Sequence, residues 1–269
     1  MEPFLKWAGG KRWMVERGVI PIPTNYRRYC EPFVGSGAVL FFLNPRHAII
    51  NDANHALMDT YRALAQHGNE VFELLKVYEA KHSHDFYYFI RNSEPQDVIS
   101  KAARFIYLNR TCWNGLYRVN KRGLFNVPKG TKDHVLLSTD NFDSTSKLLQ
   151  KCEIYDGDFE EIINKTEAGD FLFVDPPYTV KHNNNGFVKY NESMFSWNDQ
   201  IRLSHAVRRA AERGVFVVVT NAKHECIKEL YTGFVLKVLA RASVIAASTD
   251  RRGTYEEFLI TNISMKKKG

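Results

Sequence analysis

With 269 residues, 44% of them hydrophobic, the chain can bury a sizeable core in one or two domains, which excludes a largely disordered protein. It shows neither a run of about 18 apolar residues nor a signal-peptide pattern, and its four cysteines form no CxxC pair. We therefore expect a cytoplasmic protein with no membrane partner, disulfide framework or zinc site. The net charge of the whole chain, +7, equals the net charge of residues 81–132 alone. The middle segment is therefore basic, and the rest of the chain is nearly neutral.

The first predicted strand leads into a glycine loop. Residues 28–33 are β-rich, and the run Glu31-Pro-Phe-Val-Gly35-Ser-Gly37 separates them from a helical pattern. Glycines in such a loop allow a tight turn and a close approach of the backbone to an adenosyl ligand. A nicotinamide dinucleotide is disfavoured because the GxGxxG pattern is incomplete.

The second predicted strand, residues 48–51, ends beside Asp52. An acid at this point is well placed to accept hydrogen bonds from both ribose hydroxyls of a nucleoside. Together, the loop and the acid favour a nucleoside site over an ordinary glycine turn beside a surface aspartate.

The middle of the chain, residues 58–140, departs from the alternation of strands and helices and predicts an inserted domain. Within it, residues 81–132 contain ten Lys or Arg against three Asp or Glu. A β-hairpin with a basic tip is predicted where residues 117–120 and 124–127 flank Lys121-Arg122-Gly123. Such a hairpin suits a DNA groove, and the alternative is a solvated basic face.

The sharpest motif, Asp175-Pro176-Pro177-Tyr178, ends the apolar strand of residues 171–174. The amino group of adenine is a poor nucleophile because its lone pair is delocalised into the ring. Asp175 and the carbonyl of Pro176 could accept hydrogen bonds from its two N–H groups, which would favour a tetrahedral nitrogen. Tyr178 would stack on a base that has left the duplex. The alternative is a proline-rich turn after a buried strand.

The remaining elements predict a doubly wound, mainly parallel α/β sheet. Apolar residues recur at helical spacing over residues 203–211, Ser196 and Asp199 resemble a capping box, and Gly214 supplies a stop. Residues 215–220 then form a strand, and residues 234–239 and 257–262 are expected to form an antiparallel pair at one side of the sheet.

Three runs, in this order, resemble the Dam-type DNA adenine-N6 methyltransferases: Phe4-Leu-Lys-Trp-Ala-Gly-Gly-Lys11, the loop of residues 31–37, and the motif of residues 175–178. Residues 108–118 and 123–130 are similar to that family's recognition region, so the resemblance covers most of the chain. It implies a seven-stranded methyltransferase sheet built from residues 1–57 and 141–269. A mainly helical target-recognition domain with the hairpin would be inserted at residues 58–140.

The resemblance also implies partners and residue roles. The methyl donor would be S-adenosylmethionine, the substrate double-stranded DNA with GATC as its target, and the enzyme a monomer without a metal. The catalytic residues would be Asp175, Pro176 and Tyr178. The cofactor-binding residues would be Trp7, Lys11, Glu31, Phe33, Gly35, Gly37, Asp52 and Asp175. The DNA-binding residues would be Asn114, Leu116, Arg118, Lys121, Arg122, Asn126, Lys129 and Lys132, with Arg118 reading a guanine.

Two other interpretations stay open at the level of sequence. Related Asp-Pro-Pro-Tyr or Asn-Pro-Pro-Tyr motifs occur in methyltransferases that act on RNA or on a protein amide, although the basic insertion favours a duplex. A catalytically inactive DNA-binding relative would keep the fold, but the intact Asp52 and residues 175–178 favour an enzyme.

Overall fold

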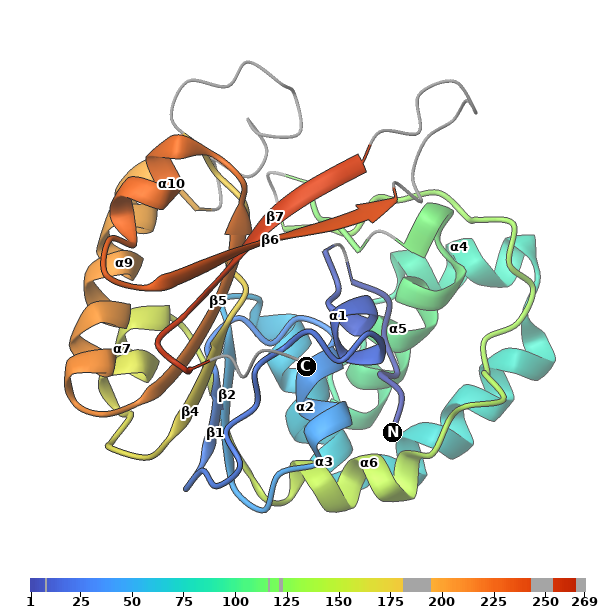
Figure 1. Ribbon diagram of the computed structural model, residues 1–269. Coiled ribbons are helices and arrows are strands. Elements are labelled where there is room, and N and C mark those ends of the chain that lie inside the picture. The colour runs from blue at the N-terminus through green and yellow to red at the C-terminus, as the bar shows by residue number, and fades with distance from the viewer. Residues whose placement is uncertain (8, 116, 121–122, 181–194, 243–253, 265–269) are drawn as a thin grey trace. The chain divides into compact units, whose positions relative to one another are not determined.

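Seven strands form one sheet in the computed structural model, in the order β3-β2-β1-β4-β5-β7-β6 (Figure 1). The structure describes residues 1–7, 9–115, 117–120, 123–180, 195–242 and 254–264. The strands are β1 Tyr29–Glu31, β2 Ala48–Asp52, β3 Cys152–Asp156, β4 Phe171–Val174, β5 Phe216–Ala222, β6 Val235–Ala242 and β7 Thr254–Thr261.

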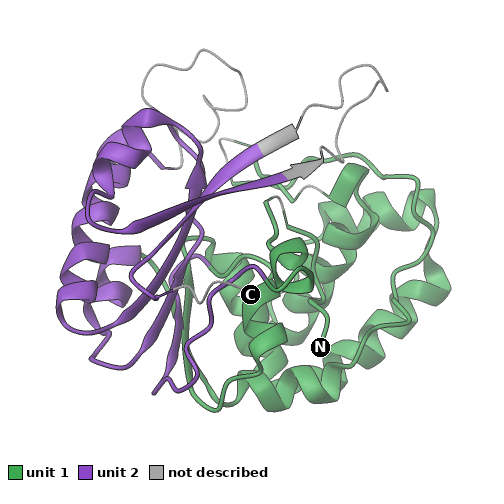
Figure 2. Ribbon diagram, in the orientation of Figure 1, with its two compact units in different colours: residues 1–18, 34–157 green, residues 19–33, 158–269 purple. Residues whose placement is uncertain are grey.

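Two compact units share these strands (Figure 2). The first comprises residues 1–18 and 34–157, and the second comprises residues 19–33 and 158–269. Helices of the first unit are α1 Arg12–Glu16, α2 Ala38–Leu43, α3 His55–Lys81, α4 His84–Asn92, α5 Val98–Thr111 and α6 Phe142–Leu149. Those of the second are α7 Phe159–Asn164, α9 Trp197–Glu212 and α10 Glu225–Leu230. No helix among the described residues has the length and apolar character needed to cross a membrane.

In the first unit, β2 and β3 run parallel, and α3 packs against both α5 and α6. Helix α3 begins where the Asn54 side chain accepts a hydrogen bond from the backbone N–H of Leu57, and it is kinked at His67. Helix α5 begins in the same way at Asp97, whose carboxylate accepts from Ser100. These caps set the start of the two longest helices of the unit.

Helix α5 also holds the N-terminal segment, residues 4–11. The buried Arg110 guanidinium makes an ion pair of 2.6 Å with Asp140 and donates two hydrogen bonds, of 3.0 and 2.9 Å, to the carbonyl of Phe4. The side chain of Asn109 accepts from the N–H of Lys6 at 2.9 Å and donates to its carbonyl at 2.8 Å. The start of the chain is thereby fixed to a helix about one hundred residues later.

In the second unit, β1, β4 and β5 run parallel, and β7 pairs antiparallel with both β5 and β6. Strand β4 is buried at every position. Helices α7 and α9 pack together along one side of these strands (Figure 1). The predicted capping box at Ser196 and Asp199 is present, and Gly214, at φ +87°, follows α9 as expected.

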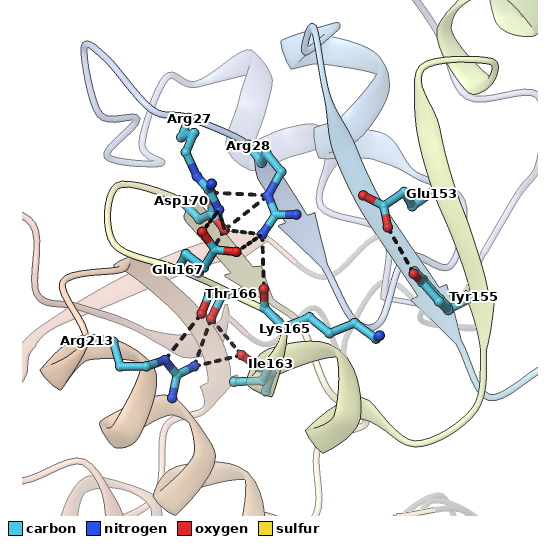
Figure 3. A network of polar contacts seen from close by, with 10 residues as sticks. All are labelled: Arg27, Arg28, Glu153, Tyr155, Ile163, Lys165, Thr166, Glu167, Asp170 and Arg213. Atoms are coloured by element: carbon cyan, nitrogen blue, oxygen red, sulfur yellow. Dashed lines mark hydrogen bonds and ion pairs between the residues drawn. The ribbon is translucent and has the colours of Figure 1, made fainter.

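An ion-pair cluster fastens the amino ends of β1 and β4 (Figure 3). The buried carboxylate of Asp170 accepts hydrogen bonds from Arg28 at 2.9 Å and from Arg27 at 3.0 Å. Burial opposes ionisation of Asp170, but the two arginines outweigh it and lower the pKa of this carboxyl. The cluster stabilises the end of β4 away from residues 175–178.

The mainly parallel seven-stranded sheet confirms the predicted α/β class, and the antiparallel pair β6 and β7 confirms the prediction for the last two strands. The inserted target-recognition domain at residues 58–140 stays a prediction. The sequence prediction missed β3, whose five residues are all at least partly exposed.

Candidate active site

The glycine loop, residues 31–37, makes the tight turn predicted for it. Gly35 and Gly37 lie at φ +48° and +69°, the left-handed region that favours glycine. A Cβ on Gly35 would stand 2.7 Å from Cδ1 of Trp7, and one on Gly37 would stand 2.9 Å from the hydroxyl of Tyr61. The loop therefore has no room for a side chain at either position.

Asp52 lies half-buried at the carboxyl end of β2 and holds this loop. Its Oδ2 accepts a hydrogen bond of 3.0 Å from the N–H of Gly35, and its Oδ1 accepts one of 3.0 Å from the N–H of Asn54. Burial raises the pKa of Asp52, and the two backbone donors offset part of that rise. A carboxylate offers about four acceptor positions, so both oxygens can accept a further hydroxyl, which fits a ribose.

The N-terminal segment places two predicted cofactor residues in the same unit as Asp52. The Trp7 ring packs on Gly35 and stacks on Phe105 with ring centroids 6.4 Å apart. Lys11 is buried, and its ammonium donates to the carbonyl of Gly9 at 3.0 Å. Trp7, Gly35 and Asp52 are thus brought together within one unit.

In the second unit, Glu31 and Phe33 occupy defined environments. The buried carboxylate of Glu31 accepts a hydrogen bond of 2.8 Å from the hydroxyl of Tyr29. Phe33 stacks on Phe159, with centroids 5.4 Å apart, and meets Phe195 edge to face at 5.6 Å. Nothing in the sequence pattern had marked Phe159 and Phe195 as neighbours of Phe33.

The Asp-Pro-Pro-Tyr motif, residues 175–178, directly follows β4 in the second unit. The Thr220 hydroxyl donates to Oδ1 of Asp175 at 2.6 Å, and the side-chain amide of Gln200 donates to the carbonyl of Pro177 at 3.2 Å. The Tyr178 hydroxyl donates to Oε2 of Glu257 at 2.7 Å. Sequence reasoning found none of these three partners, because each lies on a different element, β5, α9 or β7.

The phenol of Tyr178 remains protonated. Its pKa is raised well above the usual range by burial first, and then by the negative charges of Asp175 and Glu257. A neutral aromatic ring beside a fixed carboxylate can offer a stacking face and a hydrogen-bond acceptor to a planar amine. The two prolines add no backbone N–H that would compete for that acceptor.

The described residues on both sides of the predicted hairpin tip, 117–120 and 123–127, are paired in the first unit. Val119 and Phe125 form an antiparallel bridge, and the N–H of Asn120 donates to the carbonyl of Leu124 at 2.9 Å. Before it, Asn114 and Gly115 both adopt positive φ, +57° and +66°. Asparagine tolerates this region better than most residues, and it often does so at functional turns.

The predicted DNA-binding residues have different surroundings. Asn114, Arg118, Asn126 and Lys132 are exposed. Lys129 is half-buried and makes an ion pair of 3.1 Å with Asp133. Leu116, Lys121 and Arg122 lie outside the described residues.

Lys6, which had not been singled out, lies beside Gly115 and Lys132. A Cβ on Gly115 would stand 3.0 Å from its Cδ. Burial and the adjacent ammonium of Lys132 lower the pKa of Lys6 to about 8.

A cavity of about 460 Å³ also lies in the first unit, between α3, α5 and the hairpin. Its lining includes Arg91, Lys101 and Arg104 together with the rings of Phe105 and Tyr117. None of the predicted site residues that the structure describes lines it. The described residues also contain no group of three or more His, Cys, Asp or Glu side chains arranged to hold a metal ion.

Comparison with known proteins identifies the family. The family model of the D12 class N6 adenine-specific DNA methyltransferases matches residues 7–245. The type II methyltransferase M1.LlaDCHI of Lactococcus lactis is 34% identical, with 97% of this chain and 95% of that protein covered. M.MjaIII of Methanocaldococcus jannaschii is 36% identical, with 97% and 99% covered, and a DNA adenine methylase of Vibrio cholerae is 28% identical, with 95% and 94% covered. The chain therefore belongs to the family of D12 class N6 adenine-specific DNA methyltransferases.

Proposed function

We propose that this protein transfers the methyl group of S-adenosylmethionine to the N6 amino group of an adenine that has left a DNA duplex, within the sequence GATC. The observation that carries the proposal is the Asp-Pro-Pro-Tyr motif, residues 175–178, whose carboxylate and phenol are each bound by a side chain of the sheet. Membership of the adenine-specific family supports adenine as the base that this motif receives.

The cofactor-binding residues would be those that the resemblance implies. Asp52 would accept the two ribose hydroxyls, and the glycine loop with Trp7 and Lys11 would enclose the rest. Glu31, Phe33 and Asp175 would also contribute. The close packing of Trp7 on Gly35 and the acceptor capacity of Asp52 support this assignment. When bound, S-adenosylmethionine supplies a methyl group already activated by its sulfonium.

The chain's own groups would then act on the adenine. Asp175 and the Pro176 carbonyl would each accept a hydrogen bond from one N–H of the amino group. These two bonds would draw the nitrogen lone pair out of the ring toward the methyl group. Tyr178 would stack on the base and fix its plane. The nitrogen would attack the methyl carbon directly, and the bond from that carbon to the sulfonium would break with its electron pair leaving on the sulfur. The nitrogen would afterwards lose one proton to solvent, so no covalent bond to the enzyme would form.

Residues 58–140 would serve as the target-recognition domain of a monomeric enzyme acting on duplex DNA. Exposed Arg118 would read a guanine with both ends of its guanidinium, while Asn114, Leu116 and Asn126 would line the same surface. Lys121, Arg122, Lys129 and Lys132 would contact phosphates. The choice of GATC rests on the resemblance to Dam-type enzymes.

The test is to incubate the protein with unmethylated DNA and labelled S-adenosylmethionine and to map the methylated adenines. We expect N6-methyladenine at GATC in duplex DNA, little transfer to RNA or protein, and almost no turnover by Asp175→Ala although it still binds the cofactor. Near-normal turnover by Asp175→Ala would refute the mechanism. Methylation confined to RNA or protein would refute the substrate, and methylation at another DNA sequence would refute GATC alone.

A further inference from the structure

We infer that Thr220 and Glu257 are positioning residues for the reacting adenine: Thr220 fixes the carboxylate of Asp175, and Glu257 fixes the ring of Tyr178. The inference rests on the proposed function, because it assigns the two side chains that hold the proposed catalytic groups in place. Both lie on strands of the sheet, far from residues 175–178 in the sequence.

Thr220 acts on one oxygen of the proposed catalytic carboxylate. It lies on β5, its side chain is fully buried, and its hydroxyl donates to Oδ1 of Asp175 at 2.6 Å. A threonine is restricted at χ1 by its branched Cβ, so its hydroxyl points in a well-defined direction. The bond therefore fixes the plane of the Asp175 carboxylate before the base arrives.

Glu257 acts on the far end of the Tyr178 ring. It is only 5% exposed, and its Oε2 accepts the Tyr178 hydroxyl at 2.7 Å. Burying a carboxylate costs free energy, whereas an apolar residue of similar size would pack without that cost. The residues that follow it on β7, Phe258, Leu259 and Ile260, are buried and apolar. A glutamate here is thus better explained by its bond to Tyr178 than by a contribution to the core.

The register of the sheet places both anchors on one face. Strands β5 and β7 are antiparallel, with Thr220 opposite Leu259 and Ala222 opposite Glu257. Residues two apart on a strand point to the same face, so Thr220 and Glu257 are diagonal neighbours. One rigid pair of strands therefore holds both functional ends of the Asp-Pro-Pro-Tyr motif.

The backbone of the motif has a separate anchor. Gln200 on α9 donates to the carbonyl of Pro177 at 3.2 Å and accepts from the side-chain amide of Asn221 at 2.9 Å. Asn221 follows Thr220 on β5, so its side chain points to the opposite face. Groups held in this way need little reorganisation when charge develops on the amino nitrogen.

For Glu257, the test combines substitutions with steady-state kinetics on duplex DNA. Glu257→Leu and Tyr178→Phe should each lower kcat by about ten- to a hundredfold with the KM for S-adenosylmethionine unchanged, because each removes one charge-assisted hydrogen bond. The double variant should be no slower than either single variant, since both remove the same bond. Glu257→Gln, which keeps an acceptor, should retain most of the activity.

The control for Glu257 lies on the same strand. Glu256 is exposed and paired with Lys223 at 2.8 Å, so Glu256→Leu should keep the wild-type kcat. The melting temperature of Glu257→Leu should not fall, because an apolar residue removes a buried charge. A normal kcat for Glu257→Leu, or effects that multiply in the double variant, would overturn the assignment of Glu257.

For Thr220, the test compares a variant that loses the side-chain hydroxyl with one that keeps it. Thr220→Val should lower kcat by about tenfold or more, and Thr220→Ser, which keeps the hydroxyl, should restore it. Equal loss in both variants would overturn the assignment of Thr220. If the wild-type protein methylated no DNA, or Asp175→Ala kept its turnover, the proposed function and this inference would fall together. An inactive Asp175→Ala beside fully active Glu257→Leu and Thr220→Val would refute the inference alone.

Discussion

Asp52 shows how a single carboxylate can build a site and also serve it. It accepts hydrogen bonds from the N–H groups of Gly35 and Asn54, so it shapes the glycine loop. Burial raises its pKa, which means that its charged form is held at a cost in this environment. Hydrogen bonds from two ribose hydroxyls would offset part of this free-energy cost and lower the pKa of Asp52 in the complex.

The first prediction concerns the pH dependence of cofactor affinity. Because the ionised Asp52 accepts both hydroxyls and the protonated form does not, affinity should be full above the raised pKa of the free protein and fall as the pH drops through it. Asp52→Ala should weaken binding by about ten- to a hundredfold at neutral pH. Calorimetric titration with S-adenosylmethionine across this pH range measures both effects.

The control for Asp52 is Asp59→Ala, which removes a more exposed carboxylate from α3 and should leave the affinity and its pH profile unchanged. Unaltered affinity in Asp52→Ala would remove this residue from the cofactor site.

The second prediction separates base reading from phosphate binding. Exposed Arg118 should read a guanine, so Arg118→Ala should relax specificity by about 1 to 3 kcal/mol at that base and leave the salt dependence of binding nearly unchanged. Lys132→Ala should instead weaken binding to all duplexes alike and reduce the salt slope by about one unit. Lys129→Ala should have a smaller salt effect, because Lys129 is already paired with Asp133.

Binding measured over a range of salt concentrations, with duplexes altered at one guanine, distinguishes these roles. Equal loss on every sequence together with a flatter salt slope would make Arg118 a phosphate contact.

Among the elements, α5 connects the two predicted functions of the first unit. Its Asn109 and Arg110 hold the N-terminal segment, and its Phe105 lies between Trp7 and Tyr117, with centroids 6.4 and 4.1 Å away. One helix therefore supports both the segment proposed to bind the cofactor and the hairpin proposed to bind DNA.

The third prediction tests this support. Arg110→Met should lower the free energy of unfolding by about 3 to 5 kcal/mol, because it leaves the buried Asp140 without its charged partner. It should also weaken cofactor binding, since Trp7 and Lys11 belong to the released segment. Urea denaturation and calorimetric titration of the same variant report the two effects.

Arg12→Met is the matched control, because it removes an exposed arginine paired with Glu2 and Glu16 and should cost at most about 1 kcal/mol. A stable Arg110→Met protein with normal affinity would contradict the role given to α5.

The elements also show what could be predicted from sequence and what could not. Strand β4 is an unbroken apolar run, and the capping box of α9 lies within four consecutive residues. The local sequence pattern was therefore sufficient to predict both elements. Strand β3 mixes charged and half-exposed residues without a strict alternation and is stabilised by pairing with β2 about one hundred residues away. Thr220 meets the Asp-Pro-Pro-Tyr motif because β5 pairs with β4, and Glu257 meets it because β7 pairs with β5. No local sequence pattern predicts which strands pair.

At the scale of the whole molecule, cofactor binding and folding are linked. A ligand that binds only the folded protein stabilises it by mass action. The fourth prediction is that S-adenosylmethionine at a hundred times its Kd adds about 2.7 kcal/mol to the free energy of unfolding. For a chain of this size, that corresponds to a rise in melting temperature of about 5 to 10 °C.

Thermal melts of two variants separate the contributions. Asp175→Ala should keep most of this rise, while Asp52→Ala at the same cofactor concentration should lose most of it. The absence of any rise for the wild-type protein would remove S-adenosylmethionine from the proposed function.

The hydrogen bonds between the N-terminal segment and α5 can form only after α5 has been made on the ribosome. Phe4 and Lys6 are made well before their partners, because Arg110 and Asn109 follow 106 and 103 positions later. At about 5 to 20 residues per second, the nascent segment waits on the order of 5 to 20 s for them. Residues 4–7 thus reach their native positions only after α5 has been made, and a chaperone would meet Trp7 before α5 does.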